Sequence, residues 1–129
     1  MRIVTQLSIF LENKPGILAR VCSAFAEKGI NMEGIMVEDG VDHAVVRMVV
    51  DSNKKAKDLL EDHGAVCLEK EVLALDMKDA PGQLVYVADK LAKARINIDY
   101  AYGSSAPEKG TATLYLRVSD AKQAMKILK

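Results

Sequence analysis

The chain has 129 residues, half of them apolar and 28% charged, with 18 basic and 18 acidic side chains. This composition is typical of a soluble globular protein, and the zero net charge argues against a nucleic-acid partner or an anionic membrane surface. No apolar run approaches the ~20 residues that a membrane-spanning helix needs, and the N-terminus carries no signal-peptide pattern, so we expect a cytoplasmic protein.

The first half of the chain alternates between strand and helix patterns. Apolar residues recur at every second position in the predicted strands and at helical spacing in the predicted helices. In chain order the prediction is a strand over 3–11, a helix from Ile17 to the C-cap Gly29, strands over 30–38 and 43–50 around Asp39-Gly40, a helix from Ser52 or Asn53 to just before Gly64, and a strand over 65–68. The order β-α-β-β-α-β indicates a ferredoxin-like α+β fold with both helices on one face of an antiparallel sheet.

The second half repeats this plan. The turn at Asn13–Leu18 returns at Asp79–Leu84, and Ile30-Asn31 returns as Ile96-Asn97, each pair 66 residues apart. Such an offset indicates an internal duplication. We therefore predict two domains, residues 1–70 and residues 71–129. Residues 66–75 join them with no Gly, Pro or Ser linker, which favours a rigid connection.

The second copy is expected to differ from the first at its end. After a helix over 84–91, the prediction is a strand over 96–102, an exposed hairpin loop over 103–110, a strand through Ala112, Leu114, Leu116 and Val118, and a helix capped by Asp120. Lys129 aligns with Glu61, so nothing matches the strand at 65–68. We expect a three-stranded second sheet whose open edge a neighbouring segment or subunit covers.

The residues of both turns resemble the ACT domain family, whose members are regulatory modules that bind amino acids. The resemblance rests on Phe10–Leu18 followed by Ala26–Met32, and on Asp79–Leu84 followed by Ile96-Asn97-Ile98, and it covers almost the whole chain. It implies two ACT modules side by side, with an amino acid bound between the strand-to-helix turn of one module and the second strand of its neighbour. It also implies a homodimer and a metabolic-enzyme partner as the regulated target.

The resemblance implies two reciprocal ligand-binding sets. The first is Asn13, Lys14, Pro15, Gly16, Ile17 and Leu18 opposite Asn97, Ile98 and Asp99; the second is Asp79, Ala80, Pro81, Gly82, Gln83 and Leu84 opposite Asn31, Met32 and Glu33. Leu11 and Met77 complete the predicted ligand-binding residues. They stand where some serine-binding members carry a histidine, which puts serine as the ligand in doubt.

Physical chemistry is consistent with such sites. Free amides at a helix start favour a carboxylate, glycine lets a ligand approach the main chain, and an asparagine offers both a donor and an acceptor. A Pro-Gly turn also starts helices that bind nothing, and the residues alone favour this simpler interpretation. The duplication and the resemblance together favour a binding site.

Other functional classes receive little support. His43 and His63 have no motif partners and are expected to be ordinary surface histidines, while Cys22 and Cys67 fit small buried hydrophobic positions. We expect no catalytic residue, no cofactor and no metal. An RNA-binding sheet would need several aromatic residues on its central strands, whereas the predicted third strands of the two copies have only Tyr115. A copper chaperone would need a Cys-x-x-Cys motif in the first loop, where this chain has Asn13-Lys14-Pro15-Gly16. The remaining alternative is a dimerising or partner-binding regulatory subunit that takes no small ligand.

Overall fold

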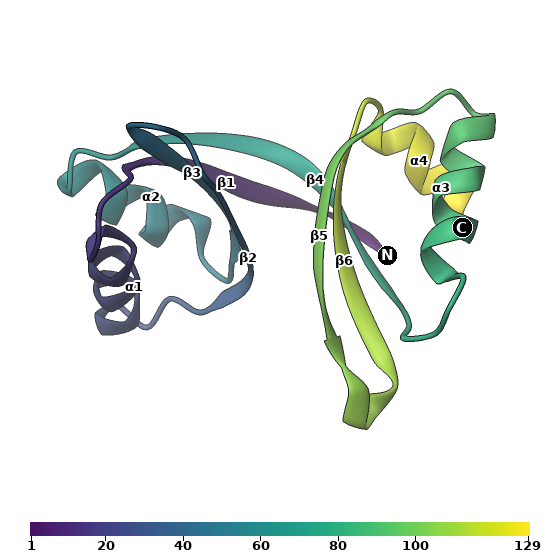
Figure 1. The fold of residues 1–129 in the computed structure, drawn as a ribbon, viewed down its shortest axis with the longest axis horizontal. Helices are drawn as coiled ribbons and strands as arrows, with labels where there is room; N and C mark the ends of the chain where they lie inside the picture. Colours follow the sequence, from purple (N-terminus) through teal and green to yellow (C-terminus); the bar gives the residue numbers. More distant parts are fainter. The chain divides into compact units, whose positions relative to one another are not determined.

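The computed structural model describes residues 1–129 (Figure 1). Its elements are β1 (Arg2–Glu12), α1 (Ile17–Glu27), β2 (Met32–Glu38), β3 (His43–Val50), α2 (Asn53–Asp62), β4 (Val66–Lys78), α3 (Gln83–Lys93), β5 (Ile98–Ala106), the short 3₁₀ helix η1 (Pro107–Lys109), β6 (Thr111–Val118) and α4 (Ala121–Leu128). The predicted α+β class with β-α-β-β-α-β modules and antiparallel strand pairs is confirmed.

The chain divides into two compact units, and each is described by itself. Residues Thr5–Lys70 form the N-terminal unit, and Glu71–Lys129 together with Met1–Val4 form the C-terminal unit. The sequence-based division placed residues 1–70 in the first domain, whereas in the structure Met1–Val4 groups with the C-terminal unit. β1 and β4 each contribute residues to both units.

The N-terminal unit has one hydrophobic core between its sheet and its helices. β3 pairs antiparallel with β1 on one side and with β2 on the other, and Ile9 stands opposite Val46. These two side chains are about 1% exposed or less, and they cluster with Phe25 of α1 and with Ala56 and Leu60 of α2. Both helices therefore pack on the same face of this sheet, as Figure 1 shows for α1 and α2.

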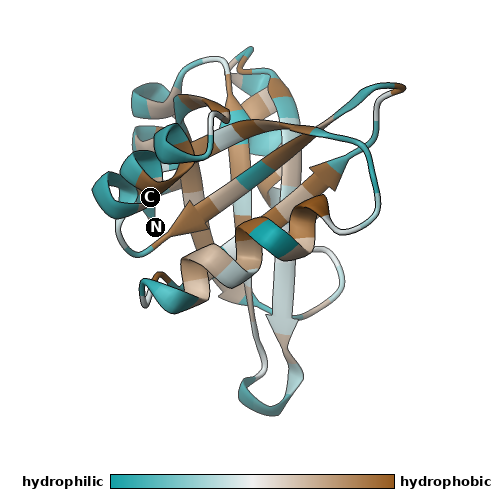
Figure 2. Ribbon diagram, turned by 90° about the vertical axis from the view of Figure 1, so that its left-hand side faces the viewer, coloured by the Kyte–Doolittle hydropathy of each residue, from teal (hydrophilic) through white to brown (hydrophobic).

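The C-terminal unit repeats this arrangement. β6 pairs antiparallel with β4 and with β5, and Leu73 stands opposite Leu116. Both leucines are fully buried and cluster with Leu91 of α3 and Ala124 of α4. Most of the brown, apolar ribbon in Figure 2 lies in strands, in keeping with cores built on one face of each sheet.

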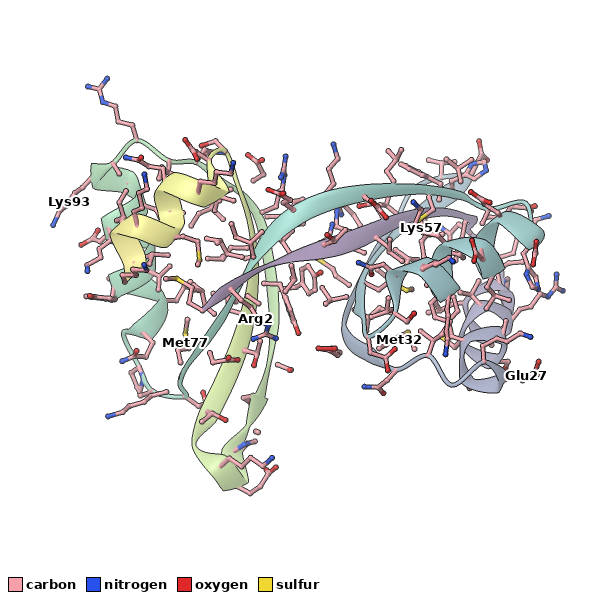
Figure 3. The ribbon with its side chains drawn as sticks, turned by 180° about the vertical axis from the view of Figure 1, so that it is seen from behind. Arg2, Glu27, Met32, Lys57, Met77 and Lys93 are labelled. Atoms are coloured by element: carbon pink, nitrogen blue, oxygen red, sulfur yellow. The ribbon has the colours of Figure 1, made fainter.

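The C-terminal unit also uses the first residues of the chain. No strand follows α4, but β1 is the neighbour of β4 in the sheet. Ile3 packs against the core of this unit, and Arg2 Nη1 lies 3.2 Å from the Asp76 carboxylate of β4. Figure 3 labels Arg2 at the start of β1 and Met77 on β4. The start of β1 thus lies where the first copy has its fourth strand.

One predicted loop is wrong in its extent. Residues 103–106, expected in an exposed loop, continue β5 and pair with Thr111–Leu114 of β6. Their Gly, Ser and Ala residues carry no strand signal, and the main-chain ladder with β6 holds them instead. Only η1 and Gly110 remain as the connection, and the hairpin projects beyond the end of β4 in Figure 1.

Candidate functional site

The two strand-to-helix turns have the same main-chain geometry. The Asn13 amide donates to the Asp42 carbonyl, and the Asp79 amide donates to the Gly110 carbonyl, each at 3.0 Å. Each turn is therefore attached to the hairpin that joins the second and third strands of its own module. The duplication extends to individual hydrogen bonds, which shows that the turn is one structural device used twice.

Each helix after the turn begins without a side-chain cap. Gly16 precedes α1 with φ of 89° and Gly82 precedes α3 with φ of 87°, both in the left-handed region that disfavours other residues. Neither helix has an acidic residue in its first turn, and a Cβ at either glycine would meet nothing within 4 Å. The Ile17 and Gln83 amides each donate to a carbonyl oxygen of their own turn at 3.4 Å, and no side chain caps the amides that follow. The positive end of each helix dipole is therefore suited to a carboxylate.

The side chains of the first turn are already engaged within the chain. Asn13 Nδ2 donates to the Gly40 carbonyl at 2.7 Å, and Lys14 Nζ lies 2.8 Å from the Glu12 carboxylate. The hydrogen bond and charge of Lys14 lower the pKa of Glu12, and Glu12 in turn raises the pKa of Lys14. The main chain, rather than these side chains, is what the turn offers to a ligand.

The predicted asparagines at the second strands are also held by a repeated contact. The main-chain amide of Asn31 donates to Asp51 Oδ1 at 3.1 Å, and the main-chain amide of Asn97 donates to Ser119 Oγ at 3.0 Å. Both asparagines are exposed, and Asn97 Nδ2 donates to Asp99 Oδ1 at 2.8 Å. These contacts fix the main chain at the start of β2 and β5. The side-chain amide of Asn31 is left at the surface.

Within one unit, the turn and the start of the second strand lie at opposite ends of the sheet. Glu12, next to the turn, stands opposite His43, whereas Met32 stands opposite Val50 at the other end of β3. The 11 residues of α1 separate the two ends by about 16 Å. Figure 3 labels Met32 and Glu27 at the end away from the turn. A site that uses both groups therefore needs residues from two modules.

The other predicted site residues fall into exposed and core positions. In the turns, Pro15, Leu18, Ala80, Pro81 and Leu84 are exposed, while Ile17 and Gln83 are half-buried; in the second strands, Glu33 and Asp99 are exposed and Met32 and Ile98 are half-buried. Leu11 is 8% exposed and belongs to the N-terminal core, and Met77 packs against the C-terminal core. Leu11 and Met77 thus anchor the strand ends before the two turns in the hydrophobic cores.

The structure adds residues that sequence reasoning missed. Met77 and Leu84 line a shallow hollow of about 290 Å³ together with Gly103–Ser105 of β5 and Ala112–Leu114 of β6. The small residues of β5 leave this space, and a Cβ at Gly103 would lie 2.6 Å from the Thr113 carbonyl oxygen. The glycine and serines were the available signal, but they were interpreted as a loop.

The histidines and cysteines form no metal centre. No three His, Cys, Asp or Glu side chains cluster as ligands of a metal ion. Cys22 and Cys67 are free and half-buried. Cys67 packs against the N-terminal core, and burial raises the pKa of its thiol. His63 Nδ1 lies 2.9 Å from the Leu59 carbonyl oxygen. None of the helices combines the length and the apolar character needed to traverse a lipid bilayer.

Comparisons with known proteins agree with this architecture. The model of the ACT domain pair matches residues 1–129. Protein BT0572 from Bacteroides thetaiotaomicron has a similar structure, with a TM-score of 0.91 and 28% identity over 98% of this chain and 86% of that one. The ligand-free regulatory subunit of aspartate kinase from Thermus thermophilus gives a TM-score of 0.72 at 16% identity over 99% and 95% of the two chains. The regulatory subunit from Thermus flavus gives 0.70 at 18% over 98% and 91%. No curated protein matches the sequence.

Proposed function

Because the chain belongs to the ACT domain family over its whole length, we propose that it is a non-catalytic regulatory protein that binds a free amino acid. The bound amino acid would favour one packing of ACT modules or subunits and so change a contact with a target, by the linkage that governs all such coupling. A cytoplasmic homodimer acting on a metabolic enzyme is the setting that this proposal assumes.

The observation that carries the proposal is the repeated uncapped helix start. α1 and α3 both follow a left-handed glycine, lack any side-chain cap and have open space in front of that glycine. The carboxylate of an amino acid would accept from the first amides of the helix, whose own cap would otherwise be a Ser, Thr, Asp or Asn. Glycine is also a common N-cap in helices that bind nothing, so the support comes from the repetition of the same uncapped start in both copies.

The second half of the proposed site comes from a neighbouring module. The turn residues 13–18 would face residues 97–99, and residues 79–84 would face residues 31–33, because one module cannot bring its own two groups together. Asn31 or Asn97 would donate to the carboxylate and accept from the ammonium group. Asn97 is less available than Asn31, since its Nδ2 donates to Asp99 at 2.8 Å.

A second candidate function is docking of a protein without any small ligand. Three consecutive apolar residues at the start of α3, Leu84, Val85 and Tyr86, are each more than half exposed. Such a patch is larger than the single exposed side chains common on protein surfaces. It favours a protein partner at the same helix start that the amino-acid proposal uses, and the two candidates make different predictions for the isolated chain.

A thermal-shift screen of the isolated protein against each common amino acid separates the two candidates. At about one hundred times the dissociation constant a ligand adds about 2.7 kcal/mol, enough to raise the unfolding midpoint of a small domain by several degrees. Asn31→Ala should reduce the shift while leaving the midpoint of the free protein unchanged, since only the side-chain amide is lost.

The control for this experiment is Gln123→Ala, which removes an exposed amide from α4 and leaves its main-chain cap bond intact. It should preserve the full shift. Absence of a shift with every amino acid would contradict the sensor proposal and favour the docking function. A shift that survives in the Asn31→Ala, Asn97→Ala double variant would instead reject the asparagine assignment alone.

A further inference from the structure

The N-terminal unit contains a cavity that shares only Leu11 and Ile17 with the residues predicted for the amino-acid site. It has a volume of about 360 Å³ and lies between α1, the C-terminal end of α2, the end of β1 and the start of β4. Its apolar wall includes Leu11, Val21, Phe25, Leu59 and Leu60. The volume is within the range of pockets that hold small molecules.

The charged groups at this cavity are unequal. Arg20, Glu12, His43 and His63 all line it. The Glu12 carboxylate is already paired with Lys14 Nζ at 2.8 Å, whereas Arg20 is exposed and forms no salt bridge. An Arg guanidinium is permanently charged and has a planar set of donors that matches a carboxylate. The cavity therefore offers one free cation beside an apolar wall.

His63 adds a second polar group at the same cavity. Its Nδ1 lies 2.9 Å from the Leu59 carbonyl oxygen, and a carbonyl can only accept, so Nδ1 carries the proton. Nε2 is then the remaining ring nitrogen, and it donates when the ring is protonated.

We propose that this cavity binds a small monocarboxylate with a branched aliphatic body. The carboxylate pairs with Arg20, and the aliphatic body lies against Val21, Leu59 and Leu60. An amino acid of the same skeleton is a poorer ligand here, because its ammonium group would compete with Lys14 for Glu12 and lose hydration. Ile17 at the start of α1 also lines the cavity, but the proposal rests on Arg20 and not on the helix-start amides, so it does not depend on the proposed function.

The internal duplication places this site in one module only. The position of Arg20 is taken by Tyr86 in the second copy, 66 residues later, and Tyr86 stacks under Lys90 Nζ at 4.6 Å from its ring centre. Tyr86 supplies no cation of its own, and Lys90 stands at the position of Ala24, whose small side chain lines the cavity in the first copy. One chain would therefore bind one such acid, in the N-terminal unit.

The test is an amide NMR titration of the full nitrogen-labelled chain with three probes of matched shape. Isocaproate has the proposed carboxylate, isocaproamide replaces it with a neutral amide, and leucine adds an ammonium group to the same skeleton. We expect saturable shifts from isocaproate at residues 20–24 and 59–64, and at least tenfold weaker binding of the other two at this cavity.

Variants locate the binding. Arg20→Gln should weaken isocaproate binding at least tenfold, because a charged hydrogen-bonding partner is lost from the carboxylate. Lys54→Gln removes a positive charge from the other end of α2 and should leave binding unchanged. Ala24→Leu should block binding by filling the cavity, which Ala24 lines. Arg20→Gln should not alter the response to the amino acid found in the thermal-shift screen.

Three outcomes would overturn the proposal. They are no saturable shift up to about 20 mM isocaproate, far above typical sensor affinities, equal binding of isocaproamide, or unchanged binding by Arg20→Gln. Each of these would leave the helix-start proposal untouched, since that site is tested by Asn31 and by a different ligand. Loss of amino-acid binding with isocaproate binding retained would reject the proposed function alone.

Discussion

At the scale of single residues, substitution of Gly16 or Gly82 tests whether each turn requires a left-handed residue. Gly16→Ala places a Cβ on a residue with φ of 89°, and the methyl group meets no other atom within 4 Å. Only the left-handed conformation is penalised, so we expect a loss of about 1–2 kcal/mol in the free energy of unfolding. Urea unfolding should show a similar loss for Gly82→Ala, whose φ is 87°. A neutral effect would mean that the turn relaxes out of the left-handed region.

The same substitution bears on function. The new methyl group would occupy the open space in front of the helix start, so Gly16→Ala should weaken amino-acid binding more than its effect on folding accounts for. Arg20→Gln is the matched comparison, because it changes the same helix and leaves the left-handed Gly16 unaltered. Its amino-acid response should equal that of the unaltered protein.

Asp76 is expected to link stability to pH. The Thr113 hydroxyl donates to Asp76 Oδ1 at 2.7 Å, and this bond, with the nearby Arg2, lowers the carboxyl pKa below its usual value of 3.8. Because the pKa of Asp76 is lower in the folded state than in the unfolded state, its carboxylate stabilises the fold at pH values above the usual pKa. That contribution disappears as the pH falls through the lower, folded-state pKa. The difference in urea midpoint between the unaltered protein and Asp76→Asn should therefore be largest near neutral pH and shrink in acid.

Asp58→Asn provides the control for this pH series. Asp58 is an exposed carboxylate of α2, and its replacement changes the net charge by the same amount. Its difference from the unaltered protein should vary less across the series. If Asp58→Asn and Asp76→Asn show the same pH dependence, net charge rather than the Thr113 bond would be responsible.

At the scale of elements, the duplication provides an internal comparison of helix caps. Asp120 Oδ1 accepts from the Gln123 amide at 3.0 Å at the start of α4, as the sequence predicted, whereas Ser52 at the start of α2 makes no side-chain cap bond. Asp120→Ala should therefore lower the free energy of unfolding by about 1 kcal/mol, and Ser52→Ala by only a few tenths. Chemical denaturation of both variants measures the difference, and equal losses would show that the Ser52 hydroxyl caps α2 in solution.

The elements also show what the sequence could and could not predict. Apolar periodicity identified all four helices because each buries a stripe against a sheet, as Phe25 and Leu91 do. The same periodicity predicted that β5 ends at residue 102. Ser104 and Ser105 are held in the strand by main-chain pairing with β6, and such pairing leaves no side-chain pattern in the sequence. The bond from Asn13 Nδ2 to the Gly40 carbonyl joins residues 27 positions apart and has no local signal either. Candidate site positions followed from motif spacing, whereas the cavity at Arg20 required the packed helices.

At the scale of the whole molecule, the assignment of residues 1–4 decides what the folding units are. A division at residue 70 would make Ile3 part of the first domain, but its side chain packs against Leu73, Leu116 and the other core residues of the C-terminal unit. At that division residues 71–129 would lose the start of β1, which lies beside β4 in the sheet. The two compact units therefore differ from the two sequence copies at residues 1–4.

Ile3→Ala tests this assignment. The side chain is half-buried, so we expect a loss of about 1–2 kcal/mol, below the range for fully buried isoleucines. The informative measurement is amide hydrogen exchange by residue, since local stability differs between structural units. Exchange should quicken at β4 residues 73–77 and at β6, while Ile9 and Val46 in the N-terminal core keep their protection. Faster exchange confined to residues 5–70 would return Ile3 to the first domain, and with it the simple division of the chain into two successive copies.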